Sequence, residues 1–85
     1  MEDLLESLYQ LLERVNDVIV CLQGDDAVKI PAKVYLPLFR DAADLANEII
    51  LAKKGLDYDN FGEEDIVDLI KKVERLEEGL KEALK

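Results

Sequence analysis

Hydrophobic residues recur at helical spacing in the first quarter of the chain. Alternating steps of four and three separate Leu4, Leu8, Leu11, Val15, Val18 and Leu22, a spacing that places them on one face of a helix. A second apolar row lies beside this face and comprises Leu5, Leu12 and Ile19 at steps of seven, with Tyr9 and Val20 just outside it. The pattern predicts a helix over about 2–23 whose apolar sector is wider than a single neighbour requires.

A second helical pattern follows two prolines. One face carries Leu38, Phe39, Ala42, Leu45, Ala46, Ile49 and Ala52, flanked by Leu36, Ala43 and Ile50. Proline is tolerated in the first turn of a helix but costs about 3 kcal/mol in its interior. We therefore expect this helix to begin near Pro31 with a kink at Pro37, or to begin at Pro37 outright, and to end at about residue 54 with Gly55 as its stop.

The third helix is expected over about 61–84. Its stripe is Ile66, Leu69, Val73, Leu76, Leu80 and Ala83, and Asn60 with Glu63 resembles a capping box at its start. The loop Asp57 to Gly62 has acids at the spacing of a calcium-binding loop, but Phe61 stands where such a loop needs a ligand oxygen. We interpret this loop as an ordinary turn.

The connections between these helices are short, so neighbouring helices should run antiparallel. Gly24 is a natural residue for the left-handed position after the first helix. The sequence therefore predicts an all-α fold, a small up-down-up three-helix bundle that forms one domain over 1–85.

Composition agrees with a helical domain and limits its chemistry. The 85 residues are 49% hydrophobic and 36% charged, with four Gly and two Pro, which is far from the composition of a disordered chain. The absence of histidine excludes histidine bases and histidine metal ligands. The single cysteine, Cys21, cannot form an intramolecular disulfide and fits a reducing compartment, and no apolar run approaches the length of a membrane span. We expect a cytoplasmic protein.

The net charge is −9, with acidic ends and a neutral middle over 25–55. A nucleic-acid partner would be repelled, because affinity for nucleic acid rests mainly on lysine and arginine that neutralise phosphates. One alternative function uses the acids directly: clustered carboxylates can imitate nucleic-acid phosphates and so inhibit a basic protein.

A second alternative rests on two carboxylate pairs at i,i+3, namely Asp41 with Asp44 and Asp65 with Asp68. On antiparallel neighbouring helices, two such pairs could hold Mg²⁺, which prefers carboxylate oxygens. These segments resemble the all-α nucleoside triphosphate pyrophosphatases of the MazG type, which carry an EExxE pattern on one helix and an ExxD pattern on the next. The resemblance implies Mg²⁺-dependent hydrolysis with these four residues as metal ligands.

The interpretation that we favour is a non-catalytic protein–protein interaction module, a small adaptor, regulator or oligomerisation domain. Its binding surface would be an apolar edge of the first helix that is bordered by acids. This edge consists of apolar residues beyond those expected to fill the core, namely Leu5, Tyr9, Leu12 and Val20. The expected partner is another protein or a second copy of the chain, bound helix on helix. This interpretation includes no catalytic residue, no cofactor and no membrane or nucleic-acid partner.

Overall fold

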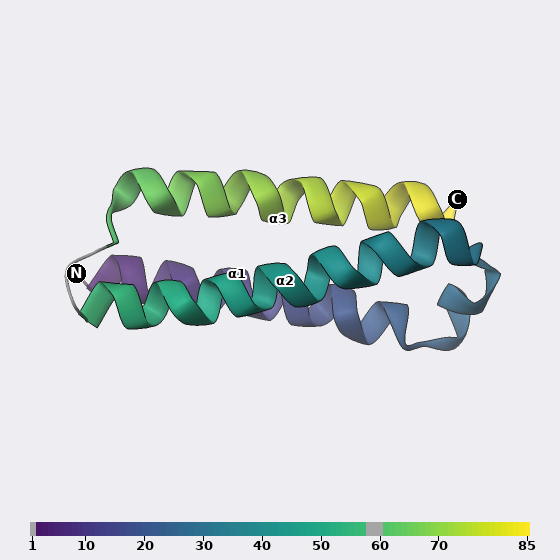
Figure 1. Ribbon diagram of the computed structural model, residues 1–85, viewed down its shortest axis with the longest axis horizontal. Coiled ribbons are helices and arrows are strands. Elements are labelled where there is room, and N and C mark those ends of the chain that lie inside the picture. The colour runs from purple at the N-terminus through teal and green to yellow at the C-terminus, as the bar shows by residue number, and fades with distance from the viewer. Residues whose placement is uncertain (1, 58–60) are drawn as a thin grey trace.

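The computed structural model describes residues 2–57 and 61–85, and these residues form a bundle of three long helices. The elements in chain order are α1 (Glu2–Leu22), the short 3₁₀ helix η1 (Asp25–Lys29), α2 (Ala32–Asp57) and α3 (Glu63–Leu84). The long helices lie side by side and alternate in direction (Figure 1), within overall extents of 42 × 18 × 17 Å. The predicted all-α, up-down-up three-helix bundle is confirmed.

The core lies along the common axis of the three helices. Its buried members are Leu8, Leu11, Val15, Val18 and Leu22 of α1, Ala42, Leu45 and Ile49 of α2, Ile66, Leu69, Val73 and Leu76 of α3, and Ala27 and Ile30 between α1 and α2. The stripe predicted for the first helix therefore points inward, except that Leu4 is only partly buried. Ala42 is fully buried, and its small side chain lets α2 approach its neighbours closely.

The link between α1 and α2 differs from the predicted glycine cap. Gly24 has φ −86° and ψ 172°, an extended conformation, and precedes η1 directly. The prediction of a left-handed Gly24 is wrong because the chain enters a 3₁₀ turn instead of reversing at the glycine. This turn buries Ala27 and Ile30, which close one end of the core.

Of the two predicted starts for the second helix, the earlier one is correct. The carbonyl of Pro31 accepts hydrogen bonds from the backbone N–H groups of Val34 at 2.9 Å and Tyr35 at 2.8 Å, and Pro37 lies inside α2. The predicted stop at Gly55 is wrong, because α2 continues to Asp57. Glycine inside a helix costs about 1 kcal/mol relative to alanine but does not break the hydrogen-bond ladder.

Helix α3 begins at Glu63, two residues later than predicted. The backbone N–H of Gly62 donates to the Asp65 carboxylate at 2.9 Å, which satisfies one donor at this end of the helix. The predicted capping residue, Asn60, and the middle of the predicted turn lie outside the described residues.

Candidate interaction surface

Each pair of helices forms one long face of the bundle, and an interhelical ion pair spans each of the two faces that include α3. On the α1–α3 side, Arg14 Nε donates to Glu77 Oε2 at 3.0 Å and a second guanidinium nitrogen lies 2.5 Å from the other oxygen. On the α2–α3 side, Lys72 Nζ lies 2.6 Å from Glu48 Oε1. Within the described residues, no salt bridge joins α1 to α2. The α1–α2 side therefore differs from the other two in having no interhelical salt bridge among the described residues.

The Arg14–Glu77 ion pair shifts the pKa of the glutamate. The hydrogen bond from Arg14 lowers the pKa of Glu77 below its usual value, and partial burial opposes this shift. The two side chains are 40% and 38% exposed, so water screens their attraction, and such a pair contributes about 0.5–1 kcal/mol. The pair joins α1 to α3 across one side of the bundle.

Two contacts define the register of α1 against α2. The Lys53 ammonium lies 4.1 Å from the centre of the Tyr9 ring, and the Tyr35 hydroxyl donates to the Leu22 carbonyl at 2.8 Å. Tyr35 and Lys53 therefore mark the side of α2 that faces α1.

The exposed surface along the junction of α1 and α2 is named the α1–α2 face. Its residues on α2 follow from helical spacing, starting from these two contacts. Phe39 lies four residues after Tyr35, and Ala46 lies seven residues after Phe39. A neighbouring row on the same side of the helix, spaced by seven residues, consists of Leu36, Ala43 and Ile50. The α1–α2 face comprises Leu5, Tyr9, Leu12, Ile19 and Val20 of α1 and Leu36, Phe39, Ala43, Ala46 and Ile50 of α2.

The residues predicted for this surface differ in how much they offer to a partner. Tyr9 is 51% exposed, Val20 is 66% exposed and Leu5 is 37% exposed. Leu12 is partly buried and packs against the core, so it forms the floor of the face rather than a projecting contact. Val20 and Tyr9 are therefore at least half accessible to another molecule, and Leu5 is accessible over about a third of its surface.

The contribution of α2 was missed by the sequence reasoning. Leu36 is 63% exposed and Ile50 is 42% exposed, and Ala43 and Ala46 lie between them along the helix. The seven-residue spacing of Leu36, Ala43 and Ile50 was the available signal, because a row that flanks the core face needs a second neighbour. These residues extend the predicted edge of one helix into a surface shared by two.

The two long borders of the α1–α2 face carry opposite charge. Exposed acids border the α1 side, at Glu6, Glu13 and Asp17, and exposed bases border the α2 side at steps of seven and fourteen, at Lys33, Arg40 and Lys54. The acidic border predicted from the sequence therefore lies along α1 alone. Because the acids Asp41, Asp44 and Glu48 line the groove between α2 and α3, the two sides of α2 also differ in charge.

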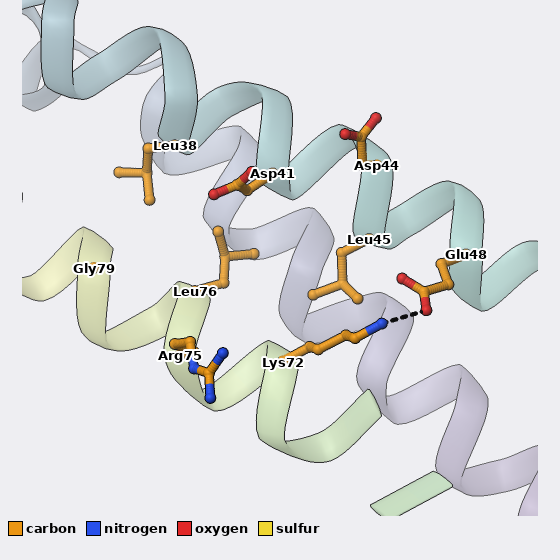
Figure 2. A pocket seen from close by; sticks show the side chains of 9 residues that line it. All are labelled: Leu38, Asp41, Asp44, Leu45, Glu48, Lys72, Arg75, Leu76 and Gly79. Carbon is orange, nitrogen blue, oxygen red and sulfur yellow. Dashed lines mark hydrogen bonds and ion pairs between the residues drawn. The ribbon is translucent and has the colours of Figure 1, made fainter. Parts of the chain in front are cut away.

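The predicted carboxylate constellation is divided between two hollows on the α2–α3 side. Asp41 and Asp44 line a groove of about 390 Å³ (Figure 2) with an apolar floor of Leu38, Leu45 and Leu76. Asp65 and Asp68 line a separate hollow nearer the start of α3.

The side chain of Lys72 lies between these two pairs of aspartates. Lys72 lines both hollows and holds Glu48, and Figure 2 shows the Asp44 carboxylate pointing away from α3. In the part of the chain that the structure describes, no group of three acidic or thiol side chains is placed to hold a metal ion. The structure does not bring together the four ligands implied by the pyrophosphatase resemblance.

Neither the family models nor the curated proteins nor the solved structures give a match to this chain. The comparisons therefore lend no support to the pyrophosphatase resemblance, which rests on short motifs. Among the described residues, no helix has an apolar stretch long enough to cross a membrane.

Proposed function

We propose that this chain is a non-catalytic protein–protein interaction module that binds through the α1–α2 face. The observation that carries the proposal is the contrast between the sides of the bundle. Among the described residues, an ion pair spans each of the two faces that include α3, whereas no salt bridge spans the α1–α2 face, which presents exposed Tyr9, Val20, Leu36 and Ile50. Exposed apolar side chains that gather on one face of a protein mark interaction sites when they form a continuous surface.

The shape and composition of the face favour a helical partner. Ala43 and Ala46 leave room in its middle for another helix to approach, with larger side chains toward both ends. Tyr9 offers a large amphipathic side chain of the type that dominates binding energy at interfaces. The charged borders would orient a partner and select against wrong ones.

The proposal places the protein in the cytoplasm, in agreement with its free Cys21. It includes no nucleic-acid partner, since 20 acidic residues face 11 basic ones. The nucleic-acid mimic and the pyrophosphatase are less well supported: lysines interrupt the acidic surface of α3 at Lys71 and Lys72, and the four aspartates do not converge.

Site-specific photo-cross-linking in native cells tests the proposal. A photoreactive phenylalanine analogue is placed at Tyr9 or Ile50 on the α1–α2 face, and at Val67 of α3 as the control, because Val67 has similar exposure at 46%. Cross-linked proteins are identified by mass spectrometry, and binding is repeated with the purified proteins. We expect specific adducts, with a second copy or with another protein, from Tyr9 and Ile50 but not from Val67.

The same purified pair is then tested with Tyr9→Glu. This variant should bind at least tenfold more weakly while its helical circular dichroism stays unchanged, because Tyr9 is exposed and does not support the core. Equal cross-linking from all three positions, or unchanged binding by Tyr9→Glu, would contradict the proposal.

A further inference from the structure

We infer that the α1–α2 face binds a second copy of this chain, so that the protein is a symmetric homodimer; this inference rests on the proposed function. The argument starts from the charges at the borders of the face. A surface with one acidic and one basic border is complementary to itself when the two copies meet with the borders exchanged. Glu6 and Asp17 on α1, and Arg40 and Lys54 on α2, provide these borders.

Symmetry and charge together select one arrangement of the copies. A twofold axis parallel to the helices lays α1 of one copy on α2 of the other, and the acidic border of each copy then meets the basic border of its partner. A twofold axis across the helices instead lays α1 on α1 and aligns acids with acids, which is destabilising. The dimer therefore has the parallel axis, with α1 running antiparallel to α2 of the other copy.

The register of the bundle then pairs particular residues. Tyr9 is level with Lys53, and Leu22 is level with Tyr35. Under the parallel axis, each residue of the second copy keeps its level, so Glu6 of one copy reaches the level of Lys54 in the other within about one helical turn of 5.4 Å. Asp17 reaches the level of Arg40 in the same way, and each pair occurs twice.

The dimensions of the bundle set the scale of the interface. The bundle is 42 Å long and 18 Å wide, so one entire side, including its charged borders, covers about 750 Å² in projection. Specific protein interfaces bury roughly 800 Å² on each partner. The apolar middle, with Tyr9, Val20 and Ile50, supplies the hydrophobic part, and the borders supply orientation.

Charge reversal measured by sedimentation equilibrium tests the inference. The single variants Glu6→Lys and Lys54→Glu, and the double variant that carries both, are each compared with the wild-type chain. Glu64→Lys and Lys71→Glu, at exposed positions of α3, are the matched controls for net charge. Each single reversal should raise the dimer Kd about three- to tenfold, because each exposed pair is lost twice and replaced by repulsion. The double variant should return to within about twofold of wild type.

Glu6→Lys is the sharpest variant, because it reduces the net negative charge and general repulsion alone would then favour association. A stronger dimer in Glu6→Lys, or a double variant no better than the single ones, would overturn the arrangement. A wild-type chain that remains monomeric would overturn the homodimer. In that case specific cross-linking from Tyr9 to a different purified protein would still uphold the proposed function, so the two failures are distinguishable.

Discussion

Lys53 of α2 holds its ammonium group 4.1 Å from the centre of the Tyr9 ring of α1. This cation–π contact joins the two helices at the α1–α2 face and is worth about 0.5–1 kcal/mol at an exposed site. Tyr9 is nevertheless 51% exposed. A side chain held in this way loses less entropy on binding than a free one, which favours its use as a contact residue.

Removing the positive charge at Lys53 should therefore affect both folding and association. We expect Lys53→Gln to lower the free energy of unfolding by about 0.5–1 kcal/mol and to weaken binding at the α1–α2 face, whereas Lys53→Arg should preserve both. Urea titration and sedimentation equilibrium measure the two effects. Lys71→Gln on exposed α3 controls for the change in net charge, and equal losses in the two glutamine variants would argue against a specific contact with Tyr9.

Neighbouring leucines of α1 should respond very differently to truncation. Leu8 is fully buried and Leu5 is 37% exposed. Leu8→Ala should cost about 2–5 kcal/mol of unfolding free energy because it leaves a cavity in the core, and Leu5→Ala should cost less than about 1 kcal/mol. Chemical denaturation measures both, and similar losses would contradict the assignment of Leu5 to the surface.

The Arg14–Glu77 pair predicts a defined pH dependence. Arg14 lowers the pKa of Glu77 from its usual 4.5, so the folded state binds this proton less readily than the unfolded state. The stabilisation is therefore present above pH 4.5 and is lost as the pH falls through the lowered pKa. Glu77→Gln should cost about 0.5–1 kcal/mol at pH 7, and its difference from wild type should shrink in acid.

Urea titrations of the wild type and Glu77→Gln across this pH range measure that difference. Glu78→Gln, which changes the net charge equally at the next position, is the control and should show a smaller loss at pH 7. A Glu77→Gln deficit that stays constant into acid would exclude the ion pair as its source.

Gly79 of α3 lies where α2 approaches closely. A Cβ atom at this position would meet Leu38 Cδ1 at 3.3 Å, and the partly buried Leu38 can turn its tip toward the open groove. Gly79→Ala should therefore raise the free energy of unfolding by about 0.5–1 kcal/mol through better helix propensity, whereas Gly79→Ile should lower it by overpacking. Thermal unfolding measures both variants, and a destabilised Gly79→Ala would mean that Leu38 cannot move aside.

The sequence predicted the core well because apolar periodicity is a local signal. The stripes of the first and third helices appear inside the bundle at Val15 and Val73, both fully buried. The glycine predictions failed because a glycine permits a left-handed turn without requiring one, so Gly24 is extended and Gly55 remains in α2.

The α1–α2 face was only half predictable from the sequence, for a different reason. Which side of α2 meets α1 depends on tertiary pairing, as does the hydrogen bond between Arg14 and Glu77, which are 63 residues apart. The edge at Tyr9 could be found from one helix. Its continuation through Ile50, and the basic border at Lys54, emerged only when α2 was placed beside α1.

An isotope-filtered NOE experiment on a mixture of ¹³C-labelled and unlabelled chains tests the central claim most directly, because it detects contacts between copies and no others. We predict intermolecular contacts between the Tyr9 ring and the Ile50 methyl groups, and none at Val67. Intermolecular contacts confined to α3 would contradict the assignment of the α1–α2 face, and the absence of any intermolecular contact at millimolar chain concentration would contradict the homodimer.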